Sequence, residues 1–350
     1  MSTPSRPGSR SKSISMSGPS AGDSGWNTMQ AIMQPLRRAA GTGVPFVLAV
    51  GLFFVINVFI PGYANLNSLL SLLLLSSLLG IASIGQTLTI VIGGFDLSIP
   101  AVIGLANVLF SLLYGAGFSA FTVTMFILAV GAVIGLANGF ASRYLQLNPL
   151  VVTLASGSII FGAIWAGTHG EISGSVPDWL VDTVSVIGQT GPIPLPGSVV
   201  LWLVIAAGIL FLEHRTTLGR WIFAAGANPR AAEVAGVPML LVWMSVYALS
   251  SLLAAATGIL LAGFSGAADP TVGTAYLFTT VAAVVVGGTP LTGGRGGYGR
   301  TIAGCLVVTE LSTLLVGLGL DQAAQQIFLG FLIVGLVALY GREAPLSMRI

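Results

Sequence analysis

The sequence is short of charge, of lysine and of cysteine. Charged residues make up 7% of its 350 residues, against 55% apolar residues. A soluble domain of this length needs a much larger charged fraction, so we exclude that class. Lys12 is the only lysine and Cys305 the only cysteine. The first scarcity excludes a lysine-containing phosphate loop for ATP, and the second excludes a disulfide framework. A net charge of +2 is too small to indicate nucleic acid as a partner.

Long apolar runs are what the sequence has in abundance. They predict an all-α polytopic membrane protein of about ten transmembrane helices. Several runs are shorter than the roughly 20 residues that a straight span needs, and two end at the glycine pairs Gly93-Gly94 and Gly287-Gly288. Such short runs are typical of broken or re-entrant helices beside a cavity. The runs cover residues 44–60, 66–92, 99–114, 118–141, 151–166, 198–212, 239–264, 274–288, 301–320 and 323–340.

The charges predict an orientation and a domain plan. With a cytoplasmic N-terminus and ten alternating spans, all 13 Lys and Arg residues lie inside. We therefore expect both termini in the cytoplasm. The plan is a disordered tail (1–43), a transmembrane domain (44–341) and a C-terminal tail (342–350), with an external loop at 167–197 and a cytoplasmic loop at 213–238. The external loops carry only acidic charges: Glu171, Asp178, Asp182, Asp269 and Asp321.

Enzymatic chemistry is not expected. The two histidines, His169 and His214, fall on opposite sides of the membrane in this plan. They cannot form a zinc site or a catalytic triad together. In the external loop 167–197, the sequence predicts a short helix flanked by turns. This loop is either a docking surface for an external partner or a plain connection.

The cytoplasmic loop 213–238 is the longest charged segment between two apolar runs in the second half. From Leu218 to Ala235 it predicts a short helix, a break, and a second helix with Asn228 as N-cap and Pro229 at its first position. Arg230 and Glu233 would be exposed beside small alanines. Two interpretations stay open, a contact surface for a soluble partner and a solvated linker.

Two acids fall at or near the apolar runs. Glu310 lies at the middle of the run 301–320, where a charge costs about 2.5–3.5 kcal/mol, so we expect it to face protein or water. It is a pathway residue or a hydrogen-bonding group between helices. Asp96, in the stretch GGFDLS, is either the N-cap of the next helix or part of a turn that shapes one end of a translocation path.

Four stretches resemble the sugar permeases of bacterial ABC importers, the ribose-type family. They are GQTLTIVIGGFDLSIPAVIGLANV (85–108), NGFASRYLQLNPLVVTLASGSIIFG (138–162), GRWIFAAGANPRAAEVAGV (219–237), and VVVGGTPLTGGRG with QQIFLG (284–296 and 325–330). The resemblance runs in order from about residue 66 to 340. It implies a multi-pass permease subunit of the bacterial inner (plasma) membrane that has no ATPase site of its own.

The resemblance also implies partners. These are a cytoplasmic ABC ATPase, a periplasmic or lipid-anchored sugar-binding protein, a second permease chain and membrane lipid, with no cofactor. It assigns ATPase coupling to Gly219, Arg220, Gly226, Asn228, Arg230, Ala232, Glu233 and Gly236. Candidates for the translocation path are Gln86, Gly93, Gly94, Asp96, Asn107, Asn138, Thr153, Thr289 and Glu310. The solute would be a neutral monosaccharide; an ion-coupled secondary transporter of a small polar solute is the alternative.

Overall fold

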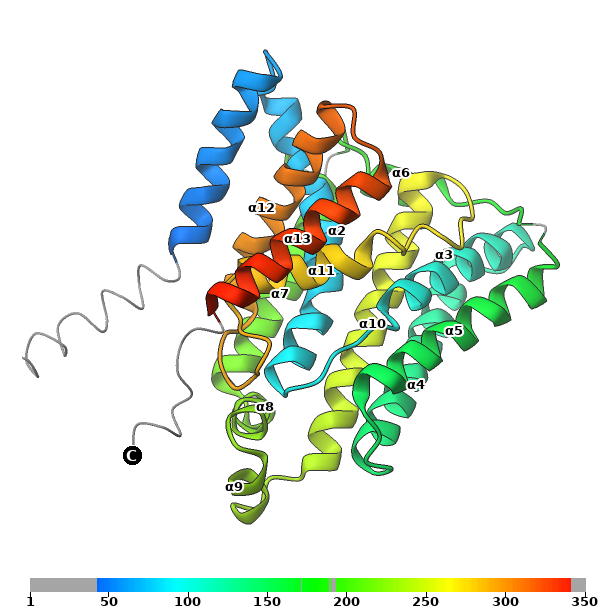
Figure 1. Cartoon of the computed structure of the whole chain (residues 1–350). Helices are drawn as coiled ribbons and strands as arrows, with labels where there is room; N and C mark the ends of the chain where they lie inside the picture. Colours follow the sequence, from blue (N-terminus) through cyan, green and yellow to red (C-terminus); the bar gives the residue numbers. More distant parts are fainter. Residues whose placement is uncertain (1–42, 171, 189, 191–192, 341–350) are drawn as a thin grey trace, which may run out of the picture. The chain divides into compact units, whose positions relative to one another are not determined.

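The computed structural model describes residues 43–170, 172–188, 190 and 193–340 (Figure 1). Apart from residue 43, the predicted tail 1–43 lies outside the described residues, as do the tail 342–350 and Glu171. The described chain is helical throughout, and a single bridge between Thr190 and Ile193 is its only β pairing. The all-α prediction is therefore confirmed.

The helices follow the apolar runs closely. Six are long and apolar enough to cross a membrane, and four apolar helices are shorter, which matches the ten predicted runs. The six are α2 (Leu66–Val91), α4 (Ala120–Arg143), α5 (Pro149–Thr168), α7 (Gly197–Arg215), α10 (Met239–Ser265) and α12 (Tyr298–Gly317). The shorter ones are an unlabelled helix (Gly43–Phe59), α3 (Ile99–Gly115), α11 (Tyr276–Val286) and α13 (Gln322–Tyr340).

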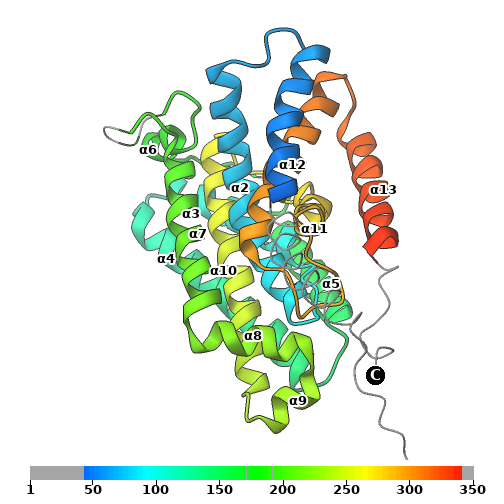
Figure 2. The same ribbon diagram turned by 90° about the vertical axis from the view of Figure 1, so that its left-hand side faces the viewer.

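Three further helices are short and belong to the predicted loops. The external loop contains α6 (Asp178–Thr183), as predicted. The loop after α7 contains α8 (Thr217–Ala227) and α9 (Pro229–Val234). Both views place α6 at one end of the helical bundle and α8 with α9 at the other (Figures 1 and 2).

The bundle is built around α10, which packs against α4, α3 and α2. Three glycines at every fourth position of α4 allow the closest approach. A Cβ at Gly135 would collide with the Tyr247 carbonyl oxygen, and one at Gly139 would lie 2.7 Å from the Met244 Cα. Lipid offers helices no hydrophobic reason to associate, so small residues that let backbones touch drive this packing.

Two helical breaks divide the bundle as the glycine pairs predicted. α2 ends at Val91 and α3 begins at Ile99, so residues 92–98 form the first break. α11 ends at Val286 and α12 begins at Tyr298, so residues 287–297 form the second break.

Candidate functional site

The first break is enclosed by polar side chains from distant helices. Asp96 is 1% exposed, and its carboxylate accepts hydrogen bonds from the Ser98 backbone N–H and hydroxyl and from the Ser250 hydroxyl of α10 (2.7 Å). The Asn138 amide of α4 donates to the Ser98 hydroxyl at 3.1 Å. We call Asp96, Ser98, Asn138 and Ser250 the polar clamp.

The backbone of the first break is held in the same way. Tyr247 of α10 donates its hydroxyl proton to the Phe95 carbonyl oxygen at 3.0 Å. The Thr153 hydroxyl of α5 accepts from the Leu97 N–H at 3.0 Å. A break in a helix exposes backbone groups that lipid cannot satisfy, so they need such partners inside the protein. The polar clamp and these two bonds therefore make the first break a fixed element.

The structure decides where α3 begins. Its N-cap is Ser98, so Asp96 lies two residues before the cap and not at it. The N-cap interpretation of Asp96 is wrong as to the residue, because Ser98 occupies that position. The Asp96 carboxylate instead joins Ser98 to Ser250, 154 positions away, and so holds the turn before α3. Asp96, Asn138 and Thr153 are thus brought together around one break, as a shared role requires.

Gly93 and Gly94 belong to the first break itself, where Gly93 is exposed and Gly94 is buried. The remaining path candidates, Gln86, Asn107, Thr289 and Glu310, are buried and lie apart from the polar clamp, each in its own surroundings. The Asn107 amide oxygen accepts from the Asp269 N–H at 2.7 Å, and the Thr289 hydroxyl accepts from the Gly297 N–H at 3.4 Å. Gln86 and Glu310 are each 1% exposed and keep a polar atom without a hydrogen-bond partner among the described residues. Glu310 therefore faces protein, as expected; that any of these residues lines a path stays a prediction.

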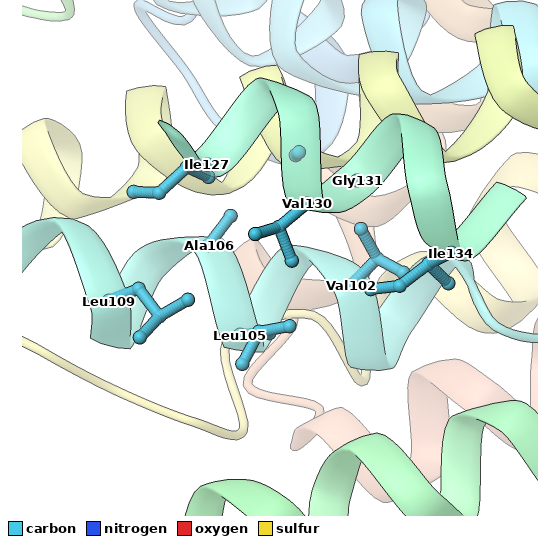
Figure 3. A pocket seen from close by; sticks show the side chains of 9 residues that line it. Val102, Leu105, Ala106, Leu109, Ile127, Val130, Gly131 and Ile134 are labelled. Atoms are coloured by element: carbon cyan, nitrogen blue, oxygen red, sulfur yellow. The ribbon is translucent and has the colours of Figure 1, made fainter. Parts of the chain in front are cut away.

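A pocket between α3, α4 and α10 does not suit a sugar. Figure 3 shows its wall of aliphatic side chains, among them Val102, Leu109 and Ile134. A sugar site needs convergent polar groups, and this pocket offers none and is too narrow for a water molecule. Nor do three His, Cys, Asp or Glu side chains gather in the described chain in a way that could hold a metal ion.

The segment after α7 folds as its sequence predicts. The Asn228 side chain accepts from the Ala231 N–H at 3.0 Å and caps α9, with Pro229 at the first helical position. At the start of α8, the Thr216 hydroxyl accepts from the Gly219 N–H at 3.1 Å, a cap that sequence reasoning missed although a threonine before a helix is its usual signal.

Two details of this segment add to the expectations. Glu233 is exposed, as expected, and it pairs with Arg143 at the end of α4. Ala232 is 5% exposed and therefore packs within the chain. Arg230 is exposed, and Val234 is 90% exposed, the highest value among large hydrophobic side chains of the described chain. The exposed surface of α9 thus includes Arg230 and Val234 beside the ion-paired Glu233.

The remaining coupling residues shape the backbone. A Cβ at Gly219 would collide with the Leu212 carbonyl oxygen, and Gly236 has φ of +81°, which favours glycine. Arg220 is exposed, and its guanidinium donates to the Thr217 hydroxyl at 3.1 Å. A Cβ at Gly226 would collide with the Val91 carbonyl oxygen, so the end of α8 touches the end of α2.

Glu213 is a residue whose role the sequence did not reveal. We expected it at the start of the loop 213–238, but α7 continues to Arg215 and the Glu213 side chain is 4% exposed. Its two carboxylate oxygens accept from the Tyr298 N–H at 3.0 and 3.2 Å. Glu213 thereby caps the N-terminus of α12 from 85 positions away, and a carboxylate is favoured at a helix N-terminus.

Comparison with known proteins identifies the family. A family model described as the branched-chain amino acid transport system / permease component matches residues 68–337. The chain belongs to this permease family. The match spans all ten apolar helices except the first, and it includes both breaks and the segment α8–α9. A permease of this family with ten apolar helices is a multi-pass membrane protein.

Several curated relatives of this permease are sugar import permeases. The ribose import permease protein RbsC of Escherichia coli (strain K12) is 29% identical over 79% of this chain and 86% of its own. The L-arabinose transport system permease protein AraH of the same strain is 30% identical over 84% and 88%. The fructose import permease protein FrcC of Rhizobium meliloti is 28% identical over 89% and 88%. The resemblance to ribose-type permeases is confirmed. No solved structure matches the permease significantly.

Proposed function

We propose that this permease is the membrane-spanning subunit of an ABC importer, and that it carries a neutral, monosaccharide-sized sugar into the cytoplasm. ATP is hydrolysed by a separate ABC ATPase, because this chain has no lysine after Lys12 with which to form a phosphate loop. A periplasmic or lipid-anchored sugar-binding protein delivers the sugar, and a second permease chain completes the pathway. The names of the relatives, which include ribose, arabinose and fructose import, support a sugar as the solute.

The observation that carries this proposal is the surface of α9. A single exposed apolar side chain is common on proteins, so Val234 supports a docking surface only together with the exposed charge and the helix contacts beside it. Val234 is 90% exposed next to the exposed Arg230, and α8 beside it touches the ends of transmembrane helices. An apolar side chain beside a free positive charge suits a groove with an acidic rim, which is the surface we assign to the ATPase.

The proposed orientation has support from the arrangement of arginines. Arg143 pairs with Glu233, and the remaining described arginines lie at the end of α7, in α8 and α9, in the second break and at the start of α12. These elements contact one another at the end of the bundle opposite α6 (Figure 2). By the positive-inside rule, that end is cytoplasmic and the protein sits in the inner membrane with α6 outside.

Val234→Glu tests the assigned surface. The added charge would oppose an acidic rim and remove an apolar contact, so the ABC ATPase should no longer co-purify, and sugar uptake in proteoliposomes should be lost. Val234→Thr keeps the shape of the side chain and should retain the ATPase. If the Val234→Glu protein still captures the ATPase and transports at the normal rate, α9 is a solvated linker.

Reconstituted uptake separates the two classes of transporter. The chain, the ATPase and the binding protein together should accumulate labelled ribose, arabinose or fructose only when ATP is supplied. Uptake by the chain alone, driven by a sodium or proton gradient, would instead show an ion-coupled secondary transporter. For the orientation, Ser175→Cys in a Cys305→Ser background should react with an impermeant maleimide in intact cells, and Thr292→Cys should not.

A further inference from the structure

The end of α8 meets two other backbones at one point. A Cβ at Gly226 would collide with the Val91 carbonyl oxygen of α2 and lie 2.8 Å from the Gly294 nitrogen of the second break. The Gly294 N–H donates to the same Val91 oxygen at 2.8 Å. From the other side, a Cβ at Gly294 would lie 2.7 Å from the Ala227 Cα. Helix α8, helix α2 and the second break are therefore in direct backbone contact.

The start of α8 reaches the second break through Glu213. A Cβ at Gly219 would lie 2.5 Å from the Glu213 carbonyl oxygen, so α8 rests on this residue. The Glu213 carboxylate in turn holds the Tyr298 N–H, where the second break ends and α12 begins. The Tyr298 hydroxyl donates to the Gly80 carbonyl oxygen of α2 and accepts from the Trp202 indole of α7 (2.6 Å). The second break is thus attached to both ends of α8.

These contacts suggest that movement of α8 can reach the transmembrane helices by a route other than the covalent chain. Only Thr216, with an extended backbone, joins α7 to α8, and α10 follows α9, so force could pass along the chain alone. We propose that α8 instead drives the transmembrane helices through the second break: Gly226 and Glu213 transmit its movement to residues 287–297, and from there to α11 and α12. The inference rests on the proposed docking of the ATPase at α8–α9 and names the residues that pass its movement on.

The physical reason lies in stiffness. Backbones that touch through glycines have no side chain between them that can change rotamer, so a displacement of α8 cannot be absorbed at Gly226. The second break itself can change shape, since it is rich in glycine, the residue with the greatest backbone freedom; its glycines at 288, 293, 294, 296 and 297 have φ between +72° and +128°, a region that favours glycine. A stiff contact on a deformable segment moves the helices attached to that segment. Gly226 and Glu213 are positioning residues in this scheme.

The test follows the second break during the ATP cycle and needs no knowledge of the sugar. Thr292 is exposed in the second break, and Cys305 is fully buried. In a Cys305→Ser background, we expect the rate at which a water-soluble maleimide labels Thr292→Cys to change severalfold when ATP and vanadate trap the assembled complex. With Gly226→Ala, the ATPase should still co-purify and hydrolyse ATP, but this change should disappear.

Sugar uptake gives the second readout. Typical coupling free energies correspond to factors of about 5 to 150, so uptake per ATP hydrolysed should fall about tenfold in Gly226→Ala. Gly208→Ala is the matched control, because Gly208 lies in α7 with open space around its Cα, and it should change neither readout. Glu213→Ala should behave like Gly226→Ala, and Glu213→Gln, which keeps one accepting oxygen, should fall between Ala and wild type.

The outcomes separate this inference from the proposed function. If the unmodified chain captures no ATPase, the proposed function fails. If capture and uptake are normal but the labelling of Thr292→Cys does not respond to ATP, or still responds in both Gly226→Ala and Glu213→Ala, the route through the second break is wrong. Should Gly226→Ala not assemble, the two Glu213 variants decide alone: a structural role lowers the amount of complex, whereas a transmission role lowers uptake per ATP in complex that has assembled.

Discussion

The first break, between α2 and α3, and the second break, between α11 and α12, are held by different means. Side chains hold the first: its own Asp96 accepts from Ser250, and Asn138, Thr153 and Tyr247 reach it from other helices. The second is held mainly by close backbone contacts that depend on the absence of side chains, with Glu213 as the one buried carboxylate that binds its end.

This difference teaches what each break can do. A network of hydrogen bonds with every partner in place fixes one conformation, because any movement leaves buried polar groups unpaired. A glycine-rich segment can change its own backbone angles at little cost while its contacts with α8 stay in place. We therefore expect the first break to keep its shape during transport and the second to change, and the following variants test that contrast.

The largest expected effect is at the polar clamp. In Asp96→Ala, the Ser98 N–H, the Ser98 hydroxyl and the Ser250 hydroxyl lose their acceptor. Leaving buried donors unpaired should lower the free energy of unfolding by about 2–4 kcal/mol. Thermal unfolding of the detergent-purified protein measures it. Asp96→Asn keeps one accepting oxygen and should lose about half as much; equal losses in the two variants would show that the network does not hold the break.

A smaller loss of stability is expected from alanine in the second break, where two glycines allow steric contact to be distinguished from backbone strain. Gly294 and Gly288 have similar φ angles, +72° and +85°, so alanine at either costs about 1–2 kcal/mol in backbone strain. Only at Gly294 does the new methyl also meet a backbone, at the Ala227 Cα; at Gly288 it meets nothing within 4 Å. Gly294→Ala should therefore unfold at a lower temperature than Gly288→Ala. Identical unfolding temperatures would mean that the contact with α8 is loose.

The smallest effect is expected at the ion pair of Arg143 and Glu233. Both side chains are partly exposed, at 32% and 47%. A pair of this kind contributes about 0–1 kcal/mol, so Arg143→Gln should barely change the unfolding temperature. Any change should shrink in high salt, which screens exposed charges. A loss as large as that in Asp96→Ala, or one that persists in high salt, would show that the pair fixes α9 and that this end of the bundle is as rigid as the first break.

Local sequence patterns predicted much of this architecture. Apolar runs marked the ten apolar helices, glycine pairs marked the ends of α2 and α11, and Asn228 with Pro229 marked the start of α9, because each of these signals acts within a few residues. The capping of α12 by Glu213 and the bond between Asp96 and Ser250 join positions 85 and 154 residues apart. No local pattern carries that information, so these partners needed a structure.

The separation of α9 from Gly226 has a consequence for how such transporters diversify. The surface that we assign to partner choice, Arg230 and Val234, is exposed and bonds to nothing else in the described chain, so it can drift or be redesigned freely. The backbone contact at Gly226 admits no side chain at all. An engineer could therefore replace the exposed surface of α9 to recruit a different ATPase while the backbone contacts between α8, α2 and the second break stay unchanged.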